Sequence, residues 1–187
     1  DRMCAIARSA GARVIFVKPA ANLRDFTPFK SEHGSIGFGE QMRWEDTLRK
    51  ARKDKREGRP NAAVEGFLAA AKIDPLHAQG LWEAADALCA AKHCDEARQY
   101  FARAADEDIC PLRATSAIQA AVEDAAGENG VPLVDFPQVL EANMPCPEER
   151  RILGDESFLD HVHPTIEGHR LLAWTLFDQL AAWNVVA

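Results

Sequence analysis

Two stretches of this sequence, AVEGFLAAAKID at residues 63–74 and ARQYFARAADED at residues 97–108, share one pattern of small and aromatic residues. In both, an alanine, a phenylalanine, a pair of alanines and an aspartate occur at the same spacing, and matched positions are 34 residues apart. Small residues let paired helices approach closely, and a phenylalanine fills the space that remains between them. The pattern therefore predicts antiparallel helix pairs, with Phe67 and Phe101 buried between the helices.

A 34-residue period of this composition resembles the tetratricopeptide repeat (TPR). One complete copy is expected at about 78–111 and a more degenerate copy at about 44–77, with Gly58 between two helices and Pro75 after the second. Such an array normally needs about three units to bury its own core. The two copies are therefore expected to pack on another part of the chain, and the resemblance implies a peptide or protein partner for them.

Outside residues 44–111, short apolar runs alternate with helical segments. Residues 14–17 and 131–136 are rich in β-branched residues, which is typical of strands covered on both faces in a parallel sheet. Helices are expected at residues 2–10, 115–128 and 165–183, with a long loop at 19–42 and a short helix within 137–158. This order predicts an α/β layer built from residues 1–43 and 112–187, into which residues 44–111 are inserted as a helical subdomain, so that helices dominate overall.

The segment Asp160-His161-Val162-His163-Pro164 places a carboxylate three residues before an imidazole, in a turn that precedes the last helix. A carboxylate in this place can accept the Nδ1–H of His163 and fix the tautomer of the ring. The second ring nitrogen is then free to act as a base toward a hydroxyl group. The pattern predicts the acid and the base of a hydrolase site.

With Glu167-Gly168-His169 and the closing helix, this segment resembles the last conserved block of the SGNH (GDSL) hydrolases. The resemblance implies that Asp160 is the orienting acid and His163 the base, and that both strands belong to a five-stranded, flavodoxin-like three-layer fold. It also implies a nucleophilic serine in a Gly-Asp-Ser motif, with a glycine N–H and an asparagine side chain completing the oxyanion hole. Neither Gly-Asp-Ser nor Gly-x-Asn-Asp occurs in the sequence, so these parts are expected upstream of Asp1.

Two other assignments compete for the same segment. His161, His163 and His169 with Asp160 suggest a metal site, but no second carboxylate cluster accompanies them, and we expect neither a metal nor another cofactor. Ser157 lies three residues before Asp160, but it does not follow a strand and a glycine turn, so we do not expect it to be the nucleophile.

Residues 22–30 follow the end of the first predicted strand, where open α/β sheets place their binding sites. Arg24, Phe26 and Phe29 are therefore candidates for a substrate pocket, with two apolar side chains and one polar side chain. The alternative is a loop that only covers the edge of the sheet.

Composition and charge exclude several classes. The net charge is −7, yet residues 1–60 carry +6 and residues 61–187 carry −13. The basic run at residues 49–56 contains no aromatic residue, so we interpret it as a solvated helix face and expect no nucleic-acid partner. No apolar run is long enough to cross a bilayer. The five cysteines form no CxxC pair and are expected to be reduced and structural.

The helical spacing of Trp174, Phe177 and Trp183 predicts that these side chains belong to the core. The chain opens at Asp1 with a sequence typical of a helix interior, so we expect it to be a segment of a longer protein. Its compartment cannot be assigned from these residues.

The sequence thus supports a hypothesis and an alternative. The hypothesis is that the chain is the C-terminal part of a serine ester hydrolase, which removes acyl groups from a lipid, sugar or small metabolite. The chain alone is expected to be inactive, because it lacks the nucleophile. The alternative is a TPR interaction module on a vestigial hydrolase scaffold. An incomplete sheet exposes edges and apolar faces, so the chain alone is expected to self-associate.

Overall fold

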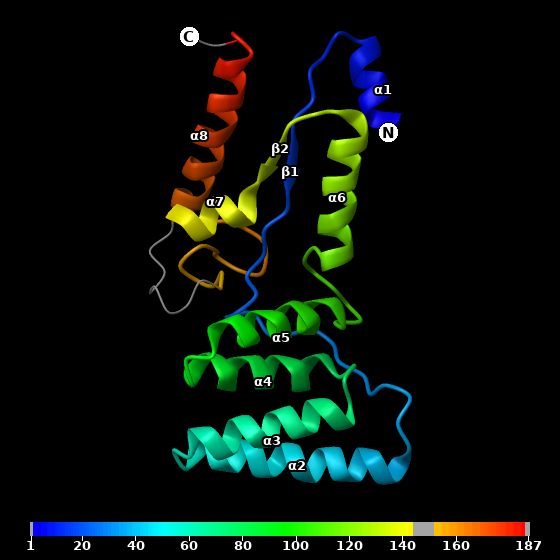
Figure 1. Cartoon of the computed structure of the whole chain (residues 1–187), viewed down its shortest axis with the longest axis vertical. Helices are drawn as coiled ribbons and strands as arrows, with labels where there is room; N and C mark the ends of the chain where they lie inside the picture. The colour runs from blue at the N-terminus through cyan, green and yellow to red at the C-terminus, as the bar shows by residue number, and fades with distance from the viewer. Residues whose placement is uncertain (1, 144–151, 186–187) are drawn as a thin grey trace.

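The computed structural model describes residues 2–143 and 152–185. Helices dominate this part of the chain, as expected, and one small parallel sheet accompanies them. The elements in chain order are α1 (Arg2–Ser9), β1 (Phe16–Lys18), α2 (Phe38–Arg56), α3 (Pro60–Ile73), α4 (Ala78–Ala90), α5 (Cys94–Asp106), α6 (Ser116–Asn129), β2 (Leu133–Asp135), α7 (Phe136–Asn143) and α8 (Ile166–Ala182). Helices α2–α5 are stacked at one end of the molecule, and both termini lie at the opposite end (Figure 1).

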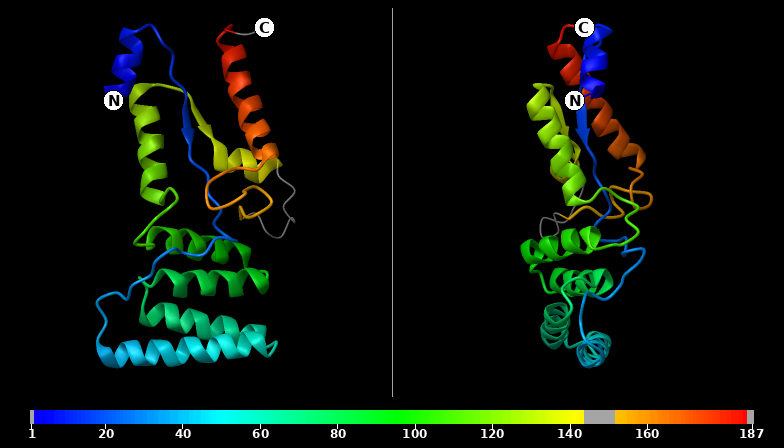
Figure 2. Two further views of the ribbon diagram at one scale, coloured as in Figure 1. Left: turned by 180° about the vertical axis from the view of Figure 1, so that it is seen from behind. Right: turned by 90° about the vertical axis from the view of Figure 1, so that its right-hand side faces the viewer.

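The two strands pair in parallel, with Val17 opposite Val134. Each strand has three residues and is shorter than the apolar run that predicted it. Pro132 contributes only its carbonyl, which accepts the N–H of Phe16 at 2.9 Å, because proline has no N–H to extend the ladder. Helices α6 and α8 lie on opposite sides of the strands (Figure 2). The parallel pairing agrees with the sequence prediction, whereas two strands do not by themselves establish the five-stranded family fold.

The stacked helices form the best-buried part of the molecule. Phe67 and Phe101 are fully buried, and residues 63–73 are helical, so both predictions made from the repeat are confirmed. Gly58 has a φ of +70° in the turn between α2 and α3, a conformation that glycine adopts without strain. Ile152, from the opposite end of the chain, packs in the same cluster as Phe101. The helical insertion therefore packs against the α/β part, as expected for an array of two units.

Two element boundaries differ from the predictions. Helix α2 begins at Phe38, so the loop after β1 ends at Gly37 instead of residue 42. Helix α6 continues through Gly127 and ends at Gly130, whose left-handed φ of +58° closes the helix. A single glycine in a helix costs only about 1 kcal/mol relative to alanine, which the packing of a long helix outweighs.

The predicted core position of the aromatic residues of α8 is wrong. Trp174 and Phe177 are 66% and 40% exposed, and Trp183 is only partly buried. Helix α8 instead packs Leu171, Leu172 and Leu176 on the cluster around β2. A sheet that is two strands wide among the described residues covers one stripe of this helix and leaves the other in solvent.

Candidate functional site

The candidate site lies in the segment 152–165 between α7 and α8, which we call the dyad loop. An antiparallel bridge between Phe158 and Pro164 closes the loop, and the N–H of Leu159 donates to the carbonyl of His163 at 2.8 Å. Phe158 is buried in the same cluster as β2, and Thr165 caps the N-terminus of α8. The loop is therefore attached at both ends to secondary structure, while its tip carries the polar residues.

Asp160 and His163 meet at the tip of the loop. His163 Nδ1 lies 2.7 Å from Asp160 Oδ2, and Asp160 Oδ1 accepts the backbone N–H groups of Val162 and His163, both at 2.8 Å. These two N–H groups, followed by the His163 side chain, hold the pKa of Asp160 well below its usual range. An ionised carboxylate can only accept, so Nδ1 carries the hydrogen and Nε2 presents a lone pair. The His163 side chain is 71% exposed, so this nitrogen is accessible.

The neighbouring histidines make further contacts. His161 Nδ1 lies 3.8 Å from Asp160 Oδ1, the carbonyl of His161 accepts the N–H of Asn22 at 3.0 Å, and its ring centre lies 4.9 Å from that of Phe26. His169 Nδ1 lies 3.0 Å from the carbonyl of Thr165, the N-cap of α8. Within residues 2–143 and 152–185, no three His, Cys, Asp or Glu side chains are grouped as a metal ion requires. The geometry therefore supports an acid–base pair at the loop tip more directly than a metal centre.

The dyad loop rests on the turn formed by residues 22–26. The N–H groups of Leu23 and Arg24 both donate to the carbonyl of Leu153 at 3.1 Å. The buried side chain of Asn22 donates to Asp155 and accepts the N–H of Asp25, both at 2.9 Å. Asn22 was not a predicted site residue, because an asparagine in a loop gives no sequence signal of a partner 133 residues away.

Arg24, a predicted pocket residue, is occupied by contacts within the protein. Its guanidinium donates to the carbonyl of Ile152 at 3.0 Å and forms ion pairs with Asp25 and Glu156. A Cβ atom on Gly154 would lie 2.3 Å from Arg24 Nη2, so only glycine fits there without movement of this network. The side chain of Arg24 joins the turn 22–26 to the dyad loop.

The two predicted pocket phenylalanines differ in position. Phe26 is partly buried and lies against His161, beside the Asp160–His163 pair. Phe29 is exposed, and its backbone N–H donates to Asp108 of the helical insertion. The structure brings Phe26 to the candidate site and turns Phe29 toward the repeat.

Ser157, a residue of the dyad loop, has a fully buried side chain. Its carbonyl accepts the N–H of Thr165 at 2.9 Å, and among the described residues its hydroxyl has no hydrogen-bond partner. Ser31 Oγ accepts the N–H of Gln79, and Ser9 Oγ donates to the carbonyl of Ile6. No hydrogen bond joins a serine hydroxyl to His163 within the part of the chain that the structure describes.

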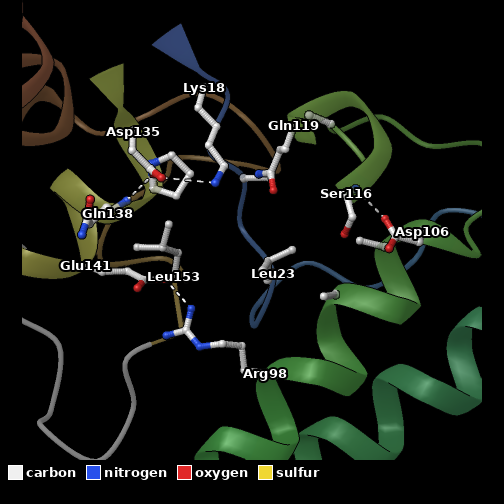
Figure 3. Close-up of a pocket in the computed structure, with 15 residues that line it drawn as sticks. Lys18, Leu23, Arg98, Asp106, Ser116, Gln119, Asp135, Gln138, Glu141 and Leu153 are labelled. Atoms are coloured by element: carbon white, nitrogen blue, oxygen red, sulfur yellow. Dashed lines mark hydrogen bonds and ion pairs between the residues drawn. The ribbon is translucent and has the colours of Figure 1, made fainter. Parts of the chain in front are cut away.

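A cavity of about 400 Å³ lies at the carboxyl ends of the two strands, against α5 (Figure 3). Its charged groups are already paired with neighbours: Lys18 lies 2.5 Å from Glu123 and 3.2 Å from Asp135, and Arg98 lies 2.5 Å from Glu141. Asp160 and His163 do not line it. The cavity and the acid–base pair are therefore separate features of the same edge of the sheet.

No match was found when the chain was compared with known protein families, with curated proteins and with solved structures. No helix in the described part of the chain combines the length and the apolar character that crossing a membrane requires.

Proposed function

We propose that Asp160 and His163 are the acid and the base of a serine ester hydrolase. The observation that carries the proposal is the 2.7 Å contact between His163 Nδ1 and an Asp160 carboxylate whose other oxygen accepts two backbone N–H groups. Such a carboxylate is preorganised to orient the ring and to stabilise the imidazolium that forms during acyl transfer. The nucleophile is a serine that this sequence does not supply, in agreement with the resemblance to the SGNH hydrolases.

The proposed reaction transfers an acyl group twice. His163 Nε2 takes the proton of the serine hydroxyl while the serine oxygen attacks the ester carbonyl carbon, and the imidazolium then gives that proton to the departing alkoxide. Water next attacks the acyl-serine, with its proton again taken by Nε2, and the carboxylic acid leaves as the serine oxygen regains a proton. Asp160 remains ionised throughout and keeps the Nδ1–H in place. No metal or cofactor is required.

The substrate class proposed is a carboxylic ester or an acylated lipid, sugar or small metabolite. Phe26 offers an apolar surface beside the pair, whereas Arg24 serves the scaffold. The exposure of His163 is consistent with a site that is completed by further residues, because an enclosed transition state needs donors for the oxyanion as well.

The test compares the chain alone with a longer protein that includes it and the serine. The chain alone is expected to hydrolyse p-nitrophenyl acetate no faster than free imidazole does. In the longer protein, His163→Ala should lower kcat by about 10³ or more, and Asp160→Asn should lower it less. His169→Ala is the matched control, because its ring contacts the carbonyl of Thr165 at the start of α8 and not Asp160 or His163, and it should leave kcat unchanged.

Two results would contradict the proposal. One is stoichiometric labelling of a serine of residues 1–187 by a fluorophosphonate, which would place the nucleophile inside this chain. The other is a longer protein that keeps full activity after His163→Ala.

A second candidate function is peptide binding by α2–α5. It is favoured by a hollow of about 460 Å³ whose lining includes Arg52, Lys55, Arg56, Trp82 and Glu83. Arg52 and Lys55 pair with Glu83 and Asp86, so an acidic peptide would bind by competing with these two carboxylates. Titration with a glutamate-rich peptide, followed by tryptophan fluorescence, should show binding that weakens with salt and after Arg52→Glu. An unchanged signal in low salt would count against this function.

A further inference from the structure

Two buried aspartates of the helical insertion bind the segment that leads from the dyad region to α2. Asp74 and Asp108 are the equivalent residues of the two repeats, 34 positions apart. Asp108 accepts the N–H groups of Phe29 at 2.6 Å and Lys30 at 3.0 Å. Asp74 lies 2.7 Å from His33 Nδ1 and accepts the N–H of Gly34. Residues 27–37, which we call the connecting segment, are thus attached to both repeats at matched positions.

The connecting segment is continuous with the turn that supports the dyad loop. Phe26, the last residue of that turn, packs its ring on His161, which lies next to Asp160. The N–H of Asn22, at the start of the turn, donates to the carbonyl of His161. Movement of the turn would therefore be transmitted to the backbone that carries Asp160 and His163.

Arg113 fastens both ends of the same turn from the side of the repeat. Its Nη1 donates to the carbonyl of Asn22 at 2.5 Å and to that of Phe26 at 2.9 Å, and its side chain is buried, with only 5% of the residue exposed. Burial lowers the pKa of this guanidinium, and the charge of Asp108, five residues earlier, raises it. The guanidinium also lies over the ring of Phe26, with Cζ 5.6 Å from the ring centre, so Arg113 holds the ring as well as the backbone of the turn.

We propose that Asp108 is a positioning residue for the Asp160–His163 pair. Its bonds to the backbone of Phe29 and Lys30 fix the start of the connecting segment next to the turn 22–26, and the turn sets the place of His161 and its neighbours. Asp74 makes the same kind of bonds farther along the segment and does not reach the turn. The helical insertion is thus part of the acid–base apparatus. The effect of this coupling on catalysis rests on the proposed function. The coupling of Asp108 to the position of the Asp160–His163 pair involves only residues of this chain.

The experiment uses the whole chain with isotopically labelled histidines and measures by NMR which nitrogen of the neutral His163 ring carries the hydrogen. Asp108→Asn replaces one of the two carboxylate oxygens that accept the N–H groups of Phe29 and Lys30 by an NH₂ group, which cannot accept. It should reduce the fraction of the neutral ring with the hydrogen on Nδ1, because a displaced Asp160 carboxylate no longer holds that hydrogen. Asp74→Asn removes equivalent bonds from the other repeat and should leave that fraction unchanged.

Stability alone does not produce this difference, because both substitutions remove buried bonds to the same segment. An equal loss of the Nδ1–H form of His163 in the two folded variants, or no loss in either, would overturn the proposal. If Asp108→Asn does not fold, Phe26→Leu tests the last link, since it removes the ring from His161 while keeping an apolar side chain. An unchanged fraction of the Nδ1–H form in that variant would overturn the proposal too.

The readout needs neither an ester nor a serine, so failure of the coupling and failure of the proposed function are distinguishable. If Asp108→Asn reduces the Nδ1–H form of His163 but the longer protein has no esterase activity, the coupling is retained and the hydrolase is rejected. Normal esterase activity in a longer protein carrying Asp108→Asn, with unchanged kcat, would retain the hydrolase and reject the coupling.

Discussion

The helical insertion and the α/β part differ in how completely each buries its own apolar residues. In α2–α5 the side chains of Trp44, Phe67 and Phe101 lie between helices, and Phe38 at the start of α2 is an exposed exception. Small residues allow close approach, since a Cβ on Gly66 would lie 2.8 Å from that of Ala51. In the α/β part, large apolar side chains of α1 and α8, such as Met3, Ile6 and Trp174, face solvent. A repeat helix finds its partner within about one period of sequence, whereas a strand depends on neighbours that come from far along the chain.

The largest expected effect is the loss of a repeat core residue. Phe101→Ala should lower the free energy of unfolding by about 3–5 kcal/mol, because it opens a cavity among fully buried neighbours. Trp174→Ala, a change of similar size on the exposed face of α8, should change it by less than about 0.5 kcal/mol. Chemical denaturation followed by circular dichroism measures both. Similar losses in the two variants would remove the contrast between the regions.

The junction between turn and dyad loop is expected to be the next most sensitive place. Gly154→Ala would place a Cβ 2.2 Å from Asp25 Oδ2, so the Arg24 network must move and give up charged hydrogen bonds. The expected loss is about 1–3 kcal/mol, measured in the same denaturation experiment. Gly39→Ala is a suitable control, since a Cβ there would meet nothing within 4 Å. A Gly154→Ala protein as stable as the parent would show that the network is not required.

Self-association should depend on the α/β part and not on the repeat. The chain alone is expected to form dimers or higher oligomers at micromolar concentration, because exposed apolar side chains of α1 and α8 remain uncovered. Trp174→Glu combined with Phe177→Glu should shift the mass measured by light scattering toward the monomer. Arg49→Glu, on the solvated face of α2, should leave the mass unchanged. A parent chain that is monomeric throughout this range would contradict the expectation.

A small gain in stability is expected from Gly127→Ala. This position lies inside α6, is exposed, and has no atom within 4 Å of an added Cβ. Alanine should stabilise the protein by about 0.5–1 kcal/mol, because it restricts the unfolded chain and favours the helix. A higher denaturation midpoint with an unchanged slope would confirm it. A lower midpoint would indicate that the glycine has a role in packing that the structure does not reveal.

The smallest effect concerns the acidity of Asp160. Because its pKa in the folded protein lies below the ordinary value of 3.8, the unfolded chain binds the proton more readily. The group therefore contributes its stability above about pH 4, and this contribution is lost as the pH falls through the lower folded-state pKa. Carboxyl-carbon NMR should show Asp160 still ionised at pH 3.8. Half-protonation at that pH would mean that its two backbone N–H bonds are not formed.

Much of the architecture followed from short-range patterns. The 34-residue spacing located Phe67 and Phe101 in a helical core, and two β-branched runs located a parallel pair of strands. The three-residue spacing of Asp160 and His163 predicted their contact, since a turn brings such neighbours together. Each of these signals lies within one element or one repeat, where the backbone geometry relates spacing to direction.

The tertiary structure decided what depends on distant partners. Arg24 was a candidate for a substrate pocket, with a loop that only covers the sheet edge as the alternative, and Ile152 and Glu156, more than 120 residues away, engage its guanidinium. Trp174 was expected in the core, but burial of a helix face depends on the width of the sheet that it meets.

The amino-acid sequence by itself determined the helical repeat, the two strand segments and the Asp160–His163 contact, because each arises from residues at fixed local spacing. Only the tertiary structure placed Asp108 against the connecting segment and Arg113 against the turn 22–26, since buried charges are satisfied by whichever backbone groups the fold brings to them.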